Sequence, residues 1–265
     1  MLMFLLASAL LADQPAPGQN LLPNPGFEAG LASWSVIGEA PGVSLDTVVR
    51  RGGGQSLRLS LPPEGYEDGF VAARQMLTFD PPLTGALRVA GWARAEDARV
   101  AQNFCIYVDA WHDDGTPLWG QNAVWPGGTH EWRRVVHEFI PTRPIARMEV
   151  FAMLRRASGT VWFDELEVCR APLDWLEFDP RLGLYGGQSL SLDALLSRPA
   201  AWSARLTDGA AVLATAEGRG AAVGLEWRGT AANAVLAVEA TDEVTGETVG
   251  TRQTMPLPRA GAPRD

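Results

Sequence analysis

The chain has 265 residues, enough for two modest domains. Its formal net charge of −9 at pH 7 and its sequence pI of about 4.9 argue against a polyanionic partner such as a nucleic acid. Every basic side chain other than histidine is an arginine. No apolar stretch reaches the roughly 18 residues that a membrane-spanning helix needs, so the sequence predicts no membrane span.

The chain begins with an apolar run, Met1 to Ala12, which ends in small residues and leads into a polar spacer from Asp13 to Gly18. This pattern is typical of the apolar part of a secretory signal, although no positive charge precedes it. We therefore expect residues 1–18 to be a signal peptide and spacer, and the protein to be secreted or held at the cell surface. The alternative is a fragment that begins in a buried strand.

Residues 20–170 consist of short stretches with strand character, separated by glycine, proline and other turn residues. This pattern predicts successive antiparallel strands with little helix, and their spacing favours a two-sheet β-sandwich. The expected strands are 44–49, 55–61, 71–79, 87–93, 102–111, 132–139, 147–154 and 160–168.

Two of these strands combine an apolar side with a mixed side. Side chains alternate between the two faces of a strand, so the even-numbered residues from Phe104 to Ala110 and from Met148 to Leu154 are expected in the core. The odd-numbered residues then face outward, and they combine aromatic rings with hydrogen-bonding groups. Sugars suit such a surface, because their ring faces stack on aromatic planes while their hydroxyls take directed hydrogen bonds.

Four segments follow one another in a characteristic order: NLLPNPGFEAGLASW at 20–34, GQSLRL at 54–59, VAGWAR at 89–94 and SGTVWFDEL at 158–166. In this order, residues 19–170 resemble the jelly-roll carbohydrate-binding modules of the family 4, 9 and 22 type. The resemblance implies an all-β, galactose-binding-like jelly roll whose open concave sheet binds a polysaccharide or cell-surface glycan. It also places four tryptophans in the scaffold core: Trp34, Trp92, Trp132 and Trp162.

The expected glycan contacts lie on the mixed strand faces and in the loop that follows the first of them. In that loop, Trp119 and Trp125 either contact glycan or close the end of the sandwich. On a neighbouring strand, Arg74 and Gln75 alternate, and either could face the groove. The expected carbohydrate-binding residues are Asn103, Tyr107, Asp109, Trp111, Trp119, Gln121, Trp125, Glu149 and Phe151.

The same resemblance implies one structural calcium ion that ties the first strand to the last. Its expected ligands are the carbonyl of Gly26 with the carboxylates of Glu28 and Asp164; weaker candidates are Asp46 and the carbonyl of Arg51. Calcium prefers several carboxylate and carbonyl oxygens, which this set supplies. In the alternative, Glu28 pairs with an arginine and Asp164 caps a turn.

A change in composition at Ala171-Pro172-Leu173 marks an expected linker. Residues 171–258 form a second series of strands and resemble a small immunoglobulin-like β-sandwich of the kind found in many secreted bacterial proteins. The turn Pro-Asp-Gly-Xaa-Tyr, typical of such modules, is replaced by Thr230–Asn233. Residues 259–265 are expected to be a disordered tail.

The sequence gives little indication of a disulfide framework, a zinc site or a catalytic site. Cys105 and Cys169 allow one disulfide in an exported protein, or two separate buried thiols. The histidines have no zinc-like spacing. Acidic neighbours such as Asp113 and Asp114 are not the facing carboxylates of a glycosidase, and the sequence contains none of the common catalytic motifs. We therefore expect no enzyme.

The sequence predicts an exported, non-catalytic glycan-binding jelly roll followed by an immunoglobulin-like spacer, with other modules of a larger surface assembly as further partners. The alternative is a structural cell-surface protein whose sandwiches pack against other proteins without binding sugar. A lyase or hydrolase would need a cluster of charged groups in the groove, where the sequence offers only Asp109, Glu149 and Arg147.

Overall fold

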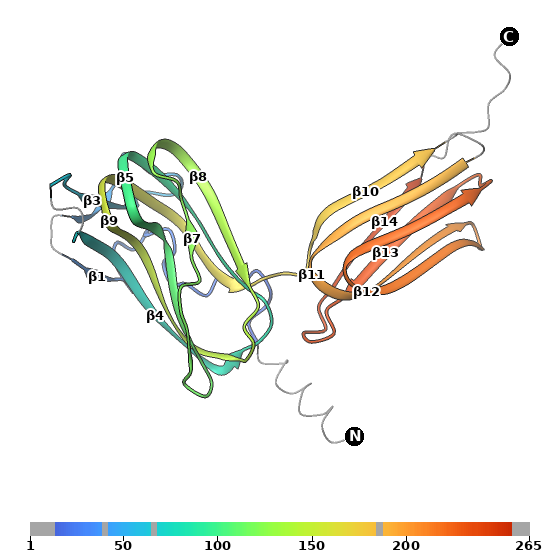
Figure 1. Cartoon of the computed structure of the whole chain (residues 1–265), viewed down its shortest axis with the longest axis horizontal. Coiled ribbons are helices and arrows are strands. Elements are labelled where there is room, and N and C mark those ends of the chain that lie inside the picture. Colours follow the sequence, from blue (N-terminus) through green and yellow to red (C-terminus); the bar gives the residue numbers. More distant parts are fainter. Residues whose placement is uncertain (1–13, 39–41, 65–67, 184–187, 256–265) are drawn as a thin grey trace, which may run out of the picture. The chain divides into compact units, whose positions relative to one another are not determined.

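The computed structural model describes residues 14–38, 42–64, 68–183 and 188–255. The regular secondary structure within these ranges consists of β-strands alone. The chain divides into two compact units, Met1–Ala171 and Pro172–Asp265 (Figure 1). Within the described residues, no helix is long and apolar enough to cross a membrane. The expected signal segment 1–12 and the expected tail 259–265 lie outside the described residues.

The first unit is an antiparallel sandwich, the predicted jelly roll. Its strands are β1 (Ser35–Ile37), β2 (Val43–Asp46), β3 (Ser56–Leu61), β4 (Phe70–Leu83), β5 (Leu87–His112), β6 (Pro117–Leu118), β7 (Ala123–Val124), β8 (Gly128–Phe139) and β9 (Ile145–Arg170). β5 and β9 pair along almost their whole lengths and each contributes to both layers. They are therefore longer than any strand that the sequence pattern predicted.

The pairing registers define the two layers. In the first sheet, β4 and β7 flank the paired segments 145–155 and 103–112, and β1 lies at the β4 edge. In the second sheet, β3 and β8 flank the paired segments 159–170 and 87–96, and β2 lies at the β3 edge.

Three residues with positive φ mark the place where β5 and β9 pass between the layers: Asp97 at 51°, Arg156 at 48° and Gly159 at 102°. The register of the pair shifts at the same place, which is the signature of bulges that bend a strand. Gly159 is required there, because an added Cβ would lie 2.4 Å from the carbonyl oxygen of Asp97.

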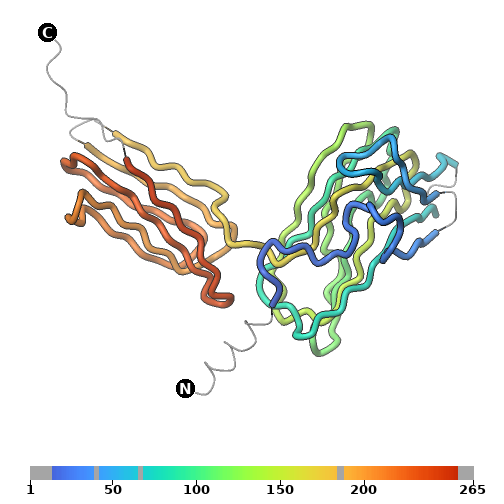
Figure 2. The backbone as a smooth tube through the Cα atoms, turned by 180° about the vertical axis from the view of Figure 1, so that it is seen from behind, coloured from blue at the N-terminus to red at the C-terminus, as the bar shows by residue number. Residues whose placement is uncertain are grey.

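The core fills the space between the two layers, as the alternating pattern predicts. Phe104 of the first sheet meets Phe163 of the second with ring centroids 5.6 Å apart. The residues expected in the core are all 0% exposed: Phe104, Ile106, Val108, Ala110, Met148, Val150, Ala152 and Leu154. Figure 2 shows the blue N-terminal segment running beside β9, where the Leu21 N–H donates to the Val168 carbonyl at 2.7 Å.

The structure settles two open points about the scaffold. Both cysteines are free and buried, so the alternative with a disulfide is wrong; burial raises the pKa of each thiol to about 12. Trp34 and Trp162 are buried as expected. Trp92 and Trp132 are instead partly exposed, and the guanidinium of Arg51 is stacked over the Trp92 ring at 3.7 Å.

The second unit is an antiparallel sheet that also folds into two layers. Its strands are β10 (Trp175–Gly183), β11 (Gln188–Asp208), β12 (Ala211–Gly229), β13 (Ala234–Thr241) and β14 (Thr248–Met255). β11 and β12 form a long hairpin whose register shifts between Leu195 and Ala200, so that β10 pairs before the shift and β13 pairs after it. The immunoglobulin-like assignment of this unit stays a prediction.

A buried ion-pair network stabilises the second unit. Arg198 binds Asp242 at 2.7 Å and Glu247 at 2.6 Å, and the Asp242 carboxylate also accepts the N–H groups of Val244 and Thr245. Burial alone would raise the pKa of Asp242, but Arg198 and the two N–H groups outweigh it and the pKa is lowered. The ionised carboxylate therefore contributes stability above its unfolded pKa, and this contribution is lost as the pH falls through the folded value.

We predict that Asp242→Asn lowers the unfolding free energy of the second unit by about 1.5–3 kcal/mol at pH 7, because Arg198 keeps Glu247 but loses its charged bond to Asp242. The asparagine oxygen can still accept the turn N–H groups. Urea unfolding of the full chain between pH 7 and pH 3 measures the effect. The difference from wild type should shrink with acidification, and a pH-independent difference would contradict the assignment.

Candidate functional site

The outward side of the first sheet combines aromatic, charged and apolar side chains, and we call it the aromatic face. Its residues lie in rows across the strands, as the pairing register shows. The rows, written from β4 through β9 to β5, are Phe70–Arg155–Asn103, Ala72–Met153–Cys105, Arg74–Phe151–Tyr107, Met76–Glu149–Asp109 and Thr78–Arg147–Trp111.

One end of the aromatic face has an apolar floor that is separate from the main core. Ala72, Cys105 and Met153 are at most 2% exposed and form this floor, and partly buried Ile37, Phe70, Tyr107 and Phe151 pack against it. The rings of Tyr107 and Phe151 meet edge to face, with centroids 6.0 Å apart. These contacts hold both rings in place before any ligand arrives.

The other end carries a pair of tryptophans. The rings of Trp111 and Trp119 are perpendicular, with centroids 5.2 Å apart, and Trp119 is 56% exposed. The guanidinium of Arg147 lies over the Trp111 ring at 4.0 Å. The loop that carries Trp119 is fixed to β5, because Asp109 accepts the Gly120 N–H at 3.1 Å.

The polar groups differ in how far they are already engaged. The side-chain oxygen of Asn103, which is 8% exposed, accepts two hydrogen bonds from Arg155, at 3.0 and 2.7 Å. Gln121 donates to the Trp119 carbonyl and its oxygen contacts His137. Glu149, by contrast, forms no ion pair or hydrogen bond with any residue that the structure describes, so its carboxylate is available to a ligand.

The hydroxyl of Tyr107 lies beside Asp109. Burial is the main cause that raises the pKa of Tyr107, and the charge of the Asp109 carboxylate and its hydrogen bond with the hydroxyl raise it further. Like any tyrosine, Tyr107 is protonated at neutral pH, and its oxygen can also accept a hydrogen bond.

Trp125 is a correction to the expected set. It is 2% exposed, its ring stacks on Phe104 at 5.5 Å, and its indole N–H donates to the Arg133 carbonyl. Val124 of β7 pairs with Cys105 and points outward, so alternation turns Trp125 into the core. The other expected residues lie on or beside the aromatic face, with Asn103 and Gln121 engaged by neighbours.

Sequence reasoning undervalued the arginines. Alternation along 147–155 predicts that Arg147 and Arg155 face outward, but the expected glycan contacts include neither, and Arg74 is expected only as an alternative to Gln75. In the structure Arg74 belongs to the aromatic face, whereas Gln75 is 3% exposed and donates to the Pro23 carbonyl. Counting by two from buried Ala73 and Leu77 would have separated them.

The expected calcium ligands come together only in part. Asp164 is 1% exposed and accepts the N–H groups of Arg51 and Gly52, while Glu28 accepts that of Gly54. An added Cβ on Gly26 would lie 3.4 Å from an Asp164 oxygen and 4.0 Å from a Glu28 oxygen, so both carboxylates border the same space. Burial raises the pKa of Asp164, and a cation beside it would favour the ionised form.

The weaker calcium candidates have other contacts. The carboxylate of Asp46 accepts the N–H groups of Val48 and Val49 and the indole N–H of Trp162. The backbone N–H of Arg51 donates to Asp164, and its guanidinium binds Glu165. Among the described residues, no three acidic, histidine or cysteine side chains gather as a metal cluster.

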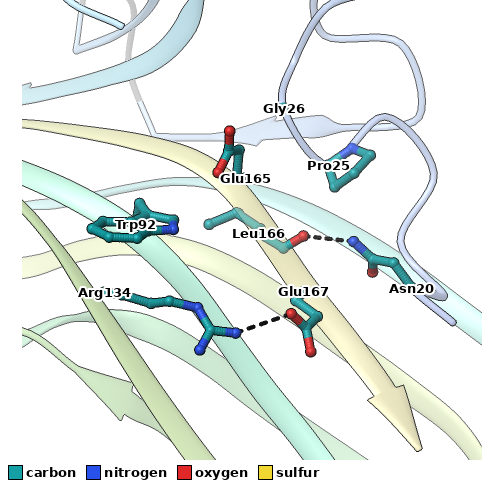
Figure 3. A pocket seen from close by; sticks show the side chains of 8 residues that line it. All are labelled: Asn20, Pro25, Gly26, Trp92, Arg134, Glu165, Leu166 and Glu167. Atoms are coloured by element: carbon teal, nitrogen blue, oxygen red, sulfur yellow. Dashed lines mark hydrogen bonds and ion pairs between the residues drawn. The ribbon is translucent and has the colours of Figure 1, made fainter. Parts of the chain in front are cut away.

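A cavity of about 270 Å³ lies on the outward side of the second sheet (Figure 3). Its charged and amide groups are already paired: Arg134 with Glu167 at 3.2 Å, Glu165 with Arg51, and Asn20 with the Leu166 carbonyl at 2.8 Å. These groups maintain the fold, so the cavity is a poorer candidate for ligand binding than the aromatic face. The lining residues are Asn20, Pro25, Gly26, Trp92, Arg134, Glu165, Leu166 and Glu167.

No protein-family model matches the chain. Among curated proteins, it is 24% identical over 162 residues to the tRNA3(Ser)-specific nuclease WapA of Bacillus spizizenii, covering 58% of this chain and 7% of that protein. The tRNA nuclease WapA of Bacillus subtilis strain 168 is 23% identical over 163 residues, with the same coverage. The chain thus spans only about 7% of the length of these relatives, and the named nuclease activity belongs to those proteins.

Solved structures of similar fold include carbohydrate-binding modules and the enzymatically active domain of a bacteriophage tailspike protein. TmCBM61 in complex with β-1,4-galactotriose is 20% identical, with a TM-score of 0.42 and coverage of 58% of this chain and 99% of that one. The C-terminal family 22 module of Clostridium thermocellum Xyn10B is 16% identical, with a TM-score of 0.45 and coverage of 59% and 97%. These likenesses concern the fold, so function has to be inferred from this chain's own residues.

We predict that Trp125→Ala lowers the unfolding free energy of the first unit by about 3–5 kcal/mol, since it empties a well-packed core position. Trp119→Ala is the matched control and should change it by less than about 1 kcal/mol, because the ring is mostly exposed. Urea unfolding of the full chain gives both values. Equal costs for the two variants would show that Trp119 is part of the core.

Proposed function

We propose that the aromatic face binds a glycan. The observation that carries the proposal is the Trp111–Trp119 pair at the surface, with one ring largely exposed, on the same sheet face as Tyr107 and Phe151. Preformed aromatic rings offer flat apolar planes for sugar rings at little cost in side-chain entropy. They serve this purpose only when hydrogen-bonding groups lie beside them.

Those groups are present in the rows between the rings. Glu149 is free to accept hydrogen bonds from sugar hydroxyls, and the Tyr107 hydroxyl, which hydrogen-bonds with Asp109, can accept one. Arg74 and Arg147 add donors on either side. The alternation of flat apolar surface with unengaged polar groups is what a glycan needs and what an ordinary solvated sheet face lacks.

We further propose that the protein binds this glycan without cleaving it. Asp109 and Glu149 are direct neighbours across β5 and β9, so both carboxylates approach a bound sugar from the same sheet surface. Glycosidases need a pair of carboxyl groups that flank the scissile bond. We also propose that the protein is secreted or displayed at the cell surface.

A protein partner is the second candidate occupant of the same face. Met76 and Val124 are 51% and 54% exposed there, and exposed apolar side chains also suit protein interfaces. A glycan array with the full chain distinguishes the two occupants. Binding to at least one glycan supports the proposal, and binding to none favours the protein-packing alternative.

We predict that Trp119→Ala and Trp111→Ala each weaken glycan binding by about 1–3 kcal/mol, roughly a 5- to 150-fold rise in Kd, because each removes a stacking surface. Isothermal titration calorimetry with the best array ligand measures the change. Leu176→Ala, which removes an exposed apolar side chain of the second unit, is the control and should leave Kd unchanged. Unaltered Kd in both tryptophan variants would exclude the aromatic face.

We also propose that Gly26, Glu28 and Asp164 hold a structural calcium ion, as the shared space between the two carboxylates suggests. When bound, the ion would supply a positive charge that joins the N-terminal segment to β9. Gly26 and Glu28 lie far from Asp164 in sequence, so the three residues come together only in the folded chain. An ion that binds only this folded arrangement would stabilise it by mass action.

We predict that calcium at 100 times its Kd raises the unfolding free energy of the first unit by about 2.7 kcal/mol, and that a chelator removes this gain. Glu28→Gln should abolish the response, since the amide keeps an oxygen for the Gly54 N–H but loses the charge. Thermal unfolding with calcium and with chelator measures it. A melting temperature indifferent to both would exclude the site.

A further inference from the structure

We infer that the glycan on the aromatic face is acidic, with carboxylate groups that the arginines of this face bind. The inference rests on the proposed glycan-binding function and names the class of ligand. It starts from the contacts that the arginines make on the two sheets of the sandwich.

On the second sheet three arginines bind glutamates, whereas Arg58 and Arg133 have no carboxylate within 4.0 Å among the described residues. Arg88 binds Glu138 at 2.7 Å, Arg94 binds Glu96 at 2.9 Å and Arg134 binds Glu167 at 3.2 Å. These pairs use the guanidinium groups within the fold.

On the aromatic face no arginine is paired in this way. Among the described residues, no carboxylate lies within 4.0 Å of Arg74, Arg147 or Arg155. Arg147 stacks on Trp111 at 4.0 Å, and Arg155 lies over Tyr107 at 5.6 Å while it binds the uncharged Asn103. Guanidinium groups that stack on rings keep their charge and their outer N–H donors for a ligand.

The arginines are also regularly placed. Their rows cross β9 at Arg155, at Phe151 (the partner of Arg74) and at Arg147. These positions are four residues apart, which corresponds to about 13 Å per step in a β-strand. Arg147 stands in the row of Trp111, and Arg74 in the row of Phe151 and Tyr107. Each of these two arginines therefore accompanies a ring on which a sugar could stack, and can reach an acid group on that sugar.

The charge of the whole chain does not oppose this inference. The net charge is −9, but charges separated by more than the Debye length of about 8 Å at physiological salt are largely screened. The local balance of charge decides, and the rows of the aromatic face carry three guanidinium groups and two carboxylates, Asp109 and Glu149. Glu149 is the one free carboxylate among the described residues of these rows and provides an internal test, because its charge should weaken the binding of an acid.

The experiment compares polygalacturonate and alginate with uncharged counterparts, methyl-esterified pectin and β-1,4-galactan, by affinity electrophoresis and calorimetry on the full chain. We expect at least one acidic polysaccharide to bind roughly tenfold or more tightly than the uncharged ones, and to lose affinity as salt rises. Arg147→Gln and Arg74→Gln should each weaken that binding roughly tenfold. Glu149→Gln should strengthen it.

The control is Arg133→Gln, which removes the same charge from an exposed position on β8 of the second sheet and should leave binding unchanged. Equal binding of acidic and uncharged polysaccharides would overturn the inference and leave the proposed function standing. Equal weakening by Arg133→Gln would also overturn it, because it would show that net charge and not this face is responsible. No binding to any polysaccharide would overturn the proposed function itself.

Discussion

β5 and β9 run side by side through both layers of the first unit, and their common bend at Asp97, Arg156 and Gly159 determines where everything else lies. Because both strands bend at the same place, the two halves of each strand close over one another and bury Phe104 against Phe163. A side chain on Gly159 would not fit, because its Cβ would lie 2.4 Å from the Asp97 carbonyl oxygen. The sandwich therefore depends on this paired bend.

The same strand pair also links the core to the aromatic face. Along 103–112 and 145–155 one set of alternate side chains fills the core, and the other set forms the rows that carry Tyr107 and Phe151. A slip of one residue in their register would exchange the two sets, so burial of the core specifies which residues face a ligand. Packing and recognition are thus fixed by one register.

This coupling explains how much the sequence could predict. Period-two alternation was enough to assign the core and the outward rings, because it depends only on neighbours in sequence. The assignments that did not rest on alternation were wrong: Trp125, expected in a loop beside the groove, stacks on Phe104 in the core, and Trp92, placed in the core by the family resemblance, is partly exposed beneath Arg51. Whether an arginine finds a glutamate is likewise decided across strands, so the free guanidinium of Arg147 became visible only in the structure.

The central claim is that the outward side of the first sheet, and not the cavity on the second sheet, binds the glycan. An NMR titration of the full chain, labelled at the tryptophan indoles, tests it most directly, because each indole N–H gives its own signal. The account predicts that a bound oligosaccharide shifts the signals of Trp111 and Trp119 and leaves those of Trp34 and Trp92 in place. Shifts confined to Trp92, which lines the cavity, would contradict it.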